Sequence, residues 1–342
     1  MAFKVNQDNL NIIDTLPREL QLQVFASFDE LTQTADDTSV WSQTSPQRQL
    51  LQVLAASPFT AQVLSLNPQW LDHDFLTSSY TKSGLAEALN HQVAQISHEL
   101  QLQQALRQFR KRDQVRLIWR NRCRLGSSAE LVQELSNLAD VCVANALQWL
   151  HQDTVTQWGQ PMGHDGQPQS LLVLGMGKLG GGELNLSSDI DLIFSYPEGG
   201  ETQGGKRSID NQQFFIRLGQ RLIQTIDTVT ADGFVFRVDM RLRPYGSSGA
   251  LALSFDAMEM YYQQQGREWE RYAFIKARVI AGNDVAGTQL LRLLRPFVYR
   301  RYLDFSAIES LRSLKQMIAS EVRRRGLQQN VKLGTGGIRE RS

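Results

Sequence analysis

The sequence has little cysteine, little proline, almost no net charge and no long hydrophobic run. Its two cysteines, Cys123 and Cys142, are too few for a disulfide framework or a structural zinc site, so we expect a reducing compartment and a cytoplasmic location. The longest apolar stretches, such as 171–176, are far shorter than the ~20 residues that a membrane helix needs, and the first residues do not resemble a signal peptide. Apolar residues make up 42% of the chain, which excludes a disordered or collagen-like protein. We therefore expect a globular protein without a membrane partner.

The net charge of +1 conceals an uneven distribution along the 342 residues. Residues 233–342 contain 19 Lys and Arg against 10 Asp and Glu, whereas residues 1–232 contain 17 against 25. A basic region can serve phosphates, nucleic acid or an acidic partner. Scattered basic residues are more often a solvated face with local ion pairs, and for this reason we expect no nucleic acid as a partner.

Apolar positions at spacings of three and four predict one helix after another up to about residue 155. Three helix starts, Ser45-Pro46, Ser57-Pro58 and Asn67-Pro68, combine a capping residue with a proline. We expect one long helix over about 85–121 and another over about 129–151. The first of these helices carries a basic cluster that we interpret as a wetted face: Arg107, Arg110, Lys111, Arg112 and Arg116.

Glycine, proline and small polar residues over 153–170 interrupt the helical periodicity and indicate a boundary. Beyond it, apolar runs predict buried strands at 171–174 and 189–196, and a period of two predicts a third strand at 234–240. A helix is expected over about 210–229. The predicted fold is therefore α+β. Its predicted parts are a helical N-terminal region over 1–160, a core that contains the strands over 161–285 and a basic helical C-terminal region over 286–342.

The segment LLVLGMGKLGGGELNLSSDIDLIF holds two overlapping motifs. Gly175, Gly177 and Gly180 match G-x-G-x-x-G after a strand, which would indicate a dinucleotide-binding oxidoreductase if a helix followed. Only GGELNLSS separates Gly180 from Asp189, which is too short for a crossover of about 10–12 residues. We therefore rank this hypothesis below a metal-dependent one.

The metal-dependent hypothesis is based on aspartates. Asp189 and Asp191 open the second strand two residues apart, so their carboxylates should project from one face of the sheet. Mg²⁺ takes one or two protein carboxylates alongside substrate phosphates. Asp239 lies in the otherwise apolar third strand, where a shared metal would remove the cost of burying a carboxylate. Taken alone, Asp-x-Asp would more often be a pair of exposed acids; together, the three aspartates are predicted to be catalytic and to bind metal.

Flexible glycine backbone and nearby donors beside these carboxylates favour phosphate binding. Arg241 and Arg243 follow Asp239 in steps of two and could clamp phosphate, although a surface salt bridge explains them about as well. The predicted nucleotide- and phosphate-binding residues are Gly175, Gly177, Lys178, Gly180, Gly181, Ser187, Ser188, Arg241 and Arg243. One or two of four further basic residues should contact substrate: Arg267, Arg271, Lys276 and Arg278. We interpret Trp269 and Tyr272 as core residues.

An apolar strand, a glycine turn, D-h-D-h and a later strand aspartate resemble the nucleotidyltransferase fold of the polymerase-beta type. GMGKLGGGELNLSSDIDLIF, FRVDMRLRPYGSSGALALSFDAMEMYY and GREWERYAFIKARVIAG are more specifically similar to the family of bacterial glutamine synthetase adenylyltransferase/adenylyl-removing enzymes. The likeness covers at least residues 171–340. Met176 departs from the Gly or Ser that the superfamily usually has after the first glycine. The resemblance implies that the core over 161–285 is a mixed-sheet nucleotidyltransferase catalytic domain.

That family has two related catalytic halves: the N-terminal half removes AMP from a tyrosine of glutamine synthetase with phosphate, and the C-terminal half attaches AMP from ATP. ELNLSSDIDLIF and FRVDMRLRP are similar to the N-terminal copy. The resemblance thus implies phosphorolysis of adenylyl-tyrosine that releases ADP, two Mg²⁺ ions for which Mn²⁺ can substitute, glutamine synthetase as protein substrate and the PII signal protein as regulator. Because Arg341-Ser342 interrupts the family pattern, we expect a truncated chain. The alternatives are adenylylation from ATP, a dinucleotide-binding oxidoreductase and a non-catalytic, PII-responsive binding module.

Overall fold

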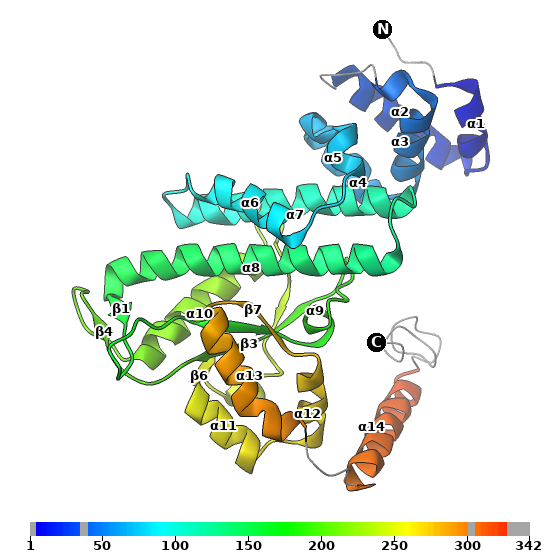
Figure 1. Cartoon of the computed structure of the whole chain (residues 1–342). Coiled ribbons are helices and arrows are strands. Elements are labelled where there is room, and N and C mark those ends of the chain that lie inside the picture. Colours follow the sequence, from blue (N-terminus) through cyan, green and yellow to red (C-terminus); the bar gives the residue numbers. More distant parts are fainter. Residues whose placement is uncertain (1–4, 35–39, 300–304, 327–342) are drawn as a thin grey trace. The chain divides into compact units, whose positions relative to one another are not determined.

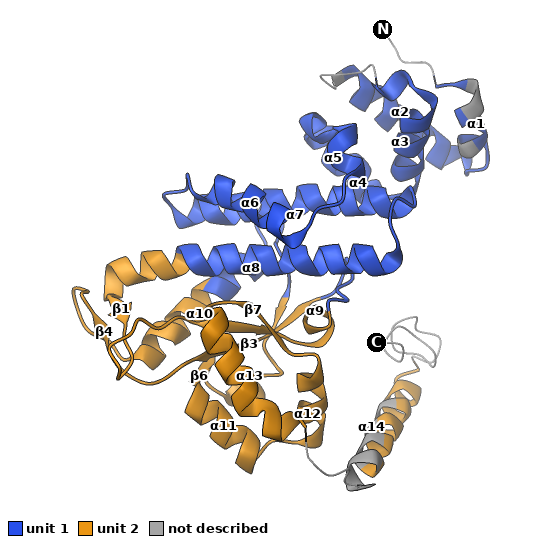
Figure 2. Cartoon of the chain, in the orientation of Figure 1, with its two compact units in different colours: residues 1–149, 182–188, 222–237 blue, residues 150–181, 189–221, 238–342 orange. Residues whose placement is uncertain are grey.

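The computed structural model describes residues 5–34, 40–299 and 305–326 (Figure 1). The chain divides into two compact units, each assembled from separated stretches of sequence (Figure 2). Unit 1 comprises residues 1–149, 182–188 and 222–237, and unit 2 comprises 150–181, 189–221 and 238–342. The linear division expected at residues 160 and 285 stays a prediction. No helix in the described residues is long and apolar enough to cross a membrane.

Unit 1 is helical, as the periodicity predicts. Its buried core includes Phe28, Leu50 and Trp41, and the indole of Trp41 meets that of Trp119 edge to face at 5.9 Å. Ser57 caps the fourth helix as expected, because its hydroxyl accepts from the amide of Thr60 at 3.2 Å. The elements that begin in unit 1 are α1 Gln7–Asp14, α2 Arg18–Thr34, η1 Val40–Ser42, α3 Thr44–Ala56, α4 Pro58–Leu66, η2 Pro68–Trp70, α5 His73–Thr77, α6 Lys82–Val93, α7 Glu99–Arg122 and α8 Ser128–Trp158.

The prediction of one helix over 85–121 is wrong, because the chain leaves helical geometry between α6 and α7. The backbone carbonyl of Ile96, which lies in this break, accepts a hydrogen bond from the indole nitrogen of Trp149 at 3.3 Å. Leu100, just after the break, is 78% exposed. A hydrogen bond from another helix therefore stabilises a break that local periodicity does not reveal.

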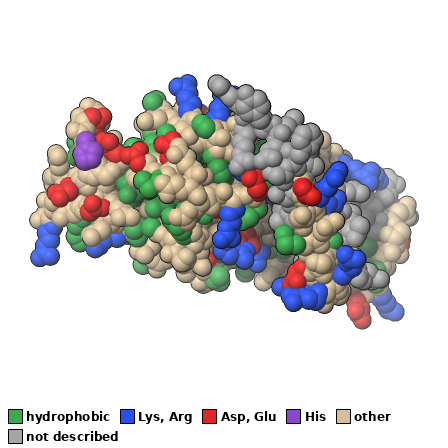
Figure 3. Space-filling view, turned by 90° about the horizontal axis from the view of Figure 1, so that it is seen from below, with side chains coloured by type: hydrophobic (Ala, Val, Ile, Leu, Met, Phe, Trp, Pro, Cys, Tyr) green, Lys and Arg blue, Asp and Glu red, His purple; other side chains and the backbone are tan. Residues whose placement is uncertain are grey.

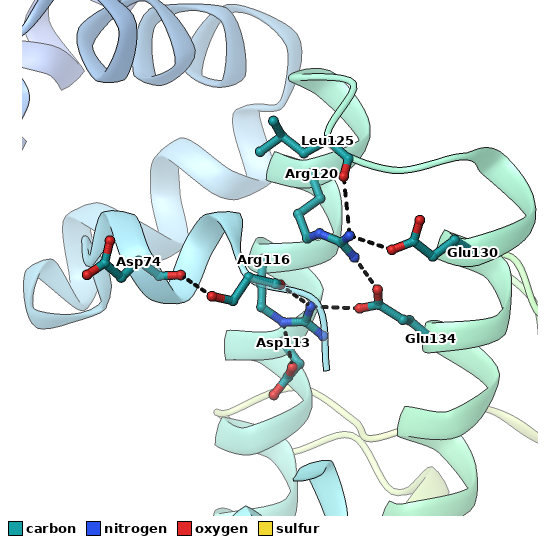
Figure 4. Close-up of polar contacts among 8 residues, drawn as sticks. Asp74, Asp113, Arg116, Arg120, Leu125, Glu130 and Glu134 are labelled. Carbon is teal, nitrogen blue, oxygen red and sulfur yellow. Dashed lines mark hydrogen bonds and ion pairs between the residues drawn. The ribbon is translucent and has the colours of Figure 1, made fainter. Parts of the chain in front are cut away.

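The interpretation of the α7 basic cluster as a wetted face is also wrong for several members, since Arg107 and Arg116 are buried. Figure 4 shows Arg116 between Asp113 of its own helix and Glu134 of α8, with nitrogen–oxygen distances of 3.0 and 2.7 Å. The neighbouring Arg120 also pairs with Glu134. Carboxylates supplied mainly by the adjacent helix compensate these guanidinium charges, which would otherwise be costly to bury.

Unit 2 is built on a five-stranded mixed sheet in which four strands follow the order β5-β3-β2-β7. β3 is antiparallel to β2 and parallel to β5, which pairs with its first residues, and to β6, which pairs with its last. The two predicted strands at 171–174 and 189–196 are therefore present, whereas only two residues of the predicted third strand belong to the sheet. The strands are β1 Gln160–Pro161, β2 Leu172–Gly175, β3 Ile190–Tyr196, β4 Thr202–Gln203, β5 Val238–Asp239, β6 Ala252–Ser254 and β7 Arg278–Ala281.

Helices of unit 2 bury the sheet through apolar side chains. Ile193 and Leu174 belong to one buried cluster with Tyr262, Phe274 and Leu290 of three flanking helices. The helix expected over 210–229 is confirmed as α10. The ring of Phe215 in α10 stacks on the ring of Tyr196 in β3, with 4.7 Å between the ring centres. The elements are α9 Gly177–Gly180, α10 Asn211–Asp227, η3 Gly246–Ser248, α11 Phe255–Gln264, α12 Glu268–Ile275, α13 Asp284–Val298 and α14 Phe305–Arg324.

The basic residues of the C-terminal part are interspersed with acidic ones. Figure 3 shows Lys and Arg side chains beside Asp and Glu side chains on the face in view. Local ion pairs account for some of them, such as Arg271 with Glu268 at 2.6 Å and Arg324 with Glu321 at 2.8 Å. The positive charge of residues 233–342 is thus partly neutralised locally.

Candidate active site

The glycine loop between β2 and β3 places its backbone directly against an acidic side chain. Gly177 has a φ of +53°, a conformation that glycine adopts without strain. A Cβ atom on Gly177 would lie 2.7 Å from Oδ2 of Asp191. Either reason alone favours glycine here, and both together let the loop pack on the carboxylate.

Asp191 and Asp239 lie directly opposite each other on β3 and β5. Because these strands are parallel and the two residues are in register, both side chains project from the same face of the sheet. Asp191 is half-buried, and the side chain of Asp239 is 16% exposed. Asp189 is exposed and lies one residue before β3. The sequence predicts Asp189 and Asp191 as a pair on one strand, whereas the structure pairs Asp191 with Asp239 across two strands and leaves Asp189 at the edge.

Arg241 brings a positive charge to all three carboxylates. Its backbone amide donates to Oδ1 of Asp239 at 2.8 Å, and its guanidinium binds both oxygens of the same carboxylate. Hydrogen bonds from Arg241 lower the pKa of Asp239, against the opposing effect of burial. The pKa of Arg241 is raised by hydrogen bonding to Asp239 and further by the charges of Asp191 and Asp189. The three predicted aspartates therefore share one electrostatic environment in unit 2.

This arrangement fits divalent metal only in part. Among the described residues, no group of three or more His, Cys, Asp or Glu side chains is arranged as a metal site. Two carboxylates in register supply the hard oxygen ligands that Mg²⁺ favours, but the guanidinium of Arg241 holds the oxygens of Asp239. Asp191 and Asp239 are consequently the residues that would hold a metal ion, after Arg241 had released its carboxylate.

The other loop glycines serve mainly close packing. A Cβ on Gly180 would lie 2.1 Å from the carbonyl oxygen of Lys276, and one on Gly175 would lie 2.8 Å from Ile280. The amides of Gly180 and Gly181 already donate to Met176 and Gly177 within the turn of α9. Anion binding by these glycines and by Lys178 stays a prediction. The sequence pattern could not separate glycines needed for packing from the one that meets a carboxylate.

Ser187 and Ser188, which precede Asp189 in the chain, belong to unit 1. The carbonyl oxygen of Ser187 accepts a hydrogen bond from Arg237 of the same unit at 3.0 Å. Their proposed role as phosphate donors remains untested.

Arg243 shapes the loop that follows β5. Its guanidinium donates to the carbonyl oxygens of Met240 at 2.8 Å, Ser247 at 3.1 Å and Gly249 at 3.4 Å. With Arg241 it lines a pocket of about 360 Å³ within unit 2. Other residues of this pocket are Tyr245, Tyr261, Arg267, Trp269 and Glu270.

The further basic residues separate into structural and pocket-lining ones. Arg271 is buried and donates to the carbonyl of Phe297 at 2.8 Å, and Arg278 donates to the carbonyls of Leu179 and Gly180 at 3.0 and 3.2 Å. Arg267 instead lines the pocket. Sequence reasoning missed Glu270, although its position three residues after Arg267 at a helix start is typical of a capping carboxylate.

The interpretation of Trp269 as a core residue is wrong, because its side chain is 36% exposed and lines the pocket. Tyr272 of the same helix is partly buried. Trp269 lies in the first turn of α12, where one side of the short helix faces outward. Helical periodicity in such a short segment does not distinguish a pocket wall from a core position.

A mixed sheet that presents in-register aspartates on neighbouring strands beside a glycine turn, with helical flanks, defines an α+β domain of the nucleotidyltransferase class. The antiparallel pairing of β2 and β3, joined by a single helical turn, contradicts a dinucleotide-binding βαβ unit.

Comparison with known proteins then identifies the family. Residues 47–293 match the family model of glutamate-ammonia ligase adenylyltransferase, and the chain belongs to this family. It is 57% identical over 293 residues to a bifunctional glutamine synthetase adenylyltransferase/adenylyl-removing enzyme of Pseudomonas aeruginosa. The aligned residues are 84% of the chain and 30% of that protein. Proteins of the same description from Pseudomonas putida and Shewanella oneidensis are 56% and 52% identical, each over 89% of the chain and over 32% and 33% of their own lengths. The chain thus spans about a third of these relatives.

Proposed function

We propose that this chain removes AMP from a tyrosine of glutamine synthetase by phosphorolysis. The observation that carries the proposal is the register of Asp191 against Asp239 on neighbouring strands. Arg241 interacts electrostatically with both carboxylates. The relatives, whose description includes both adenylyltransferase and adenylyl-removing activity, support glutamine synthetase as the protein substrate. The sequence resemblance of the glycine–aspartate segment to the adenylyl-removing half supports the direction.

In the proposed reaction an oxygen of inorganic phosphate attacks the adenylyl phosphorus in line. The new P–O bond gives ADP, the bond between phosphorus and the tyrosine oxygen breaks, and the phenolate takes up a proton from solvent. Phosphate is already anionic near neutral pH, and a phenol with a pKa of ~10 leaves readily once its charge is stabilised. Bringing two anions together is the main barrier, so guanidinium groups beside the carboxylates, above all Arg241, are expected to bind and orient phosphate.

The proposal includes Mg²⁺, with Asp191 and Asp239 as protein ligands and Asp189 as a further carboxylate at the edge of the site. Two bound divalent ions, the number that the resemblance implies, would supply charge stabilisation for the phosphoryl oxygens. Mn²⁺ is proposed as a substitute. Gly177 leaves room for the Asp191 carboxylate, because a Cβ atom at this position would collide with it.

The decisive assay mixes the chain with adenylylated glutamine synthetase, phosphate and Mg²⁺ and measures ADP. Asp191→Asn should lower the rate on the order of 10²–10³-fold, because a ligand charge is lost while the shape is kept. Asp284→Asn, an exposed aspartate in the first turn of α13, is the matched control and should leave the rate unchanged. Undiminished ADP release by Asp191→Asn would refute the assignment.

Adenylylation from ATP is the second candidate, because the name of the relatives includes adenylyltransferase as well. AMP transfer from ATP to unmodified glutamine synthetase by this chain alone would favour it over phosphorolysis. We also propose the PII signal protein as regulator and the cytoplasm as location. The free thiols of Cys123 and Cys142 are in keeping with a reducing compartment.

A further inference from the structure

The pocket beside the carboxylates combines positive charge with exposed aromatic surface. Arg241, Arg243 and Arg267 contribute guanidinium groups, and Tyr245 and Trp269 contribute rings that are 49% and 36% exposed. Its volume of about 360 Å³ lies in the range of small-molecule sites. Guanidinium groups favour phosphate, and aromatic faces favour planar rings, so the lining suits a ligand that carries both.

The aromatic wall is held in place by interactions with a buried carboxylate. Tyr245 packs edge to face on Tyr261 at 4.5 Å between ring centres. The hydroxyl of Tyr261 donates to Glu270 at 2.8 Å, and the other oxygen of Glu270 accepts from the backbone amide of Arg267 at 2.8 Å. Both oxygens of this buried acid are therefore engaged inside the wall. Glu270 therefore positions the tyrosine and the start of α12.

Tyr245 adopts an unusual backbone conformation for its position. Its φ of +61° and ψ of 9° are left-handed, which is disfavoured for residues other than glycine. Strain of this kind persists where the surroundings enforce it and is common at ligand sites. Here it directs a half-exposed ring to the pocket beside Gly246, a residue that is itself left-handed.

The pocket and the carboxylates share Arg241, which gives a bound ligand a direction. Arg241 bonds to Asp239 and also lines the pocket, whereas Arg267 and Trp269 come from the start of α12. A phosphate bound between Arg267 and Arg241 would therefore lie at the side of the pocket that is linked to Asp239.

We infer that this pocket binds a nucleoside phosphate, with Arg267 holding phosphate and Trp269 contacting the base. In the proposed reaction the ligand is the adenylyl group, bound first as protein-linked AMP and then as free ADP. The inference rests on the proposed function for the identity of the base. The lining residues by themselves support a site for a phosphate joined to a planar ring.

The test measures binding separately from turnover in the full chain. Equilibrium dialysis with labelled ADP in the presence of Mn²⁺ should show that Arg267→Gln weakens ADP about tenfold, the loss expected for one charge-assisted contact. Trp269→Phe should abolish the change in tryptophan fluorescence that ADP causes and weaken ADP more than inorganic phosphate. Arg292→Gln and Trp158→Phe are the controls, since Arg292 is an exposed residue of α13 and neither residue lines the pocket.

The outcomes separate the two proposals. ADP binding that depends on Arg267 and Trp269, without ADP production from adenylylated glutamine synthetase, would support the pocket and contradict the phosphorolysis. ADP production with unchanged ADP affinity in Arg267→Gln and Trp269→Phe would overturn the pocket and leave the phosphorolysis standing. A loss of affinity for inorganic phosphate alone, with ADP unaffected by Trp269→Phe, would overturn the assignment of the base.

Discussion

At the scale of single residues, the charge of Arg241 dominates the candidate site. It binds both oxygens of Asp239 and interacts electrostatically with Asp189 and Asp191. A guanidinium that binds both oxygens of a carboxylate repels a divalent ion and occupies part of the lone pairs that the ion would use. Arg241 therefore competes with metal in the free protein, and in the proposed reaction the same guanidinium becomes available to phosphate when metal displaces it.

Replacement of Arg241 by Gln should have opposite effects on metal binding and on turnover. Without the competing charge, Mn²⁺ should bind about two- to fivefold more tightly, the range expected for an exposed ion pair. Phosphorolysis should nevertheless slow, because a phosphate contact is lost. Electron paramagnetic resonance of Mn²⁺ measures the affinity, and Arg241→Lys, which keeps the charge but not the bidentate contact, should lie between the wild type and Arg241→Gln. Weaker Mn²⁺ binding by Arg241→Gln would show that Arg241 supports the metal.

The same substitution should change the acid titration of Asp239. Hydrogen bonds from Arg241 are the main cause of its lowered pKa, and burial opposes them, so the pKa should rise in Arg241→Gln. In the wild type this carboxylate adds stability above its unfolded-state pKa and loses that contribution as the pH falls through its folded-state pKa. The variant should lose less stability over this acidic window. Carbon-13 NMR of the side-chain carboxyl follows the titration directly.

At the scale of elements, sequence periodicity predicts individual helices and strands better than the contacts between them. Apolar spacing predicts α10, because this helix buries one continuous face, and apolar runs predict the strands β2 and β3, because nearly all of their residues are buried. It did not predict the burial of Arg116, since the compensating Glu134 lies on another helix. The three aspartates could be selected from their spacing, but the Asp191–Asp239 register depends on strand pairing that the sequence does not state.

The network between α7 and α8 provides a test of buried charge compensation. Glu134 pairs with both Arg116 and Arg120, and all three side chains are nearly inaccessible to solvent (Figure 4). Glu134→Gln should destabilise the fold by ~3–5 kcal/mol, because two buried guanidinium charges lose their shared partner. Urea unfolding measures the change. Glu130→Gln removes a half-exposed partner of Arg120 and should have little effect. Equal effects of the two variants would argue against this account.

At the scale of the whole molecule, the chain order does not coincide with the packing. Unit 1 includes residues 182–188 and 222–237, which follow the start of unit 2 in the sequence. Within unit 1, Arg107 donates to the carbonyls of Thr228 and Gly233, and the hydroxyl of Ser136 accepts from the amide of Leu184 at 3.0 Å. Helices near the N-terminus therefore provide the hydrogen-bonding partners of segments that surround the catalytic strands in the sequence.

A fragment of residues 161–342 should consequently fail to fold on its own, even though it contains every proposed catalytic residue. Removal of the first 160 residues exposes Leu184, Val235 and Phe236, which are buried in the complete chain, and removes Arg107 and Ser136. Exposed apolar segments of this kind favour aggregation over a cooperative transition. Size-exclusion chromatography and urea unfolding of the fragment beside the full chain provide the measurement. A monomeric fragment with a single cooperative transition would show instead that the catalytic core folds independently of the segments that it shares with unit 1.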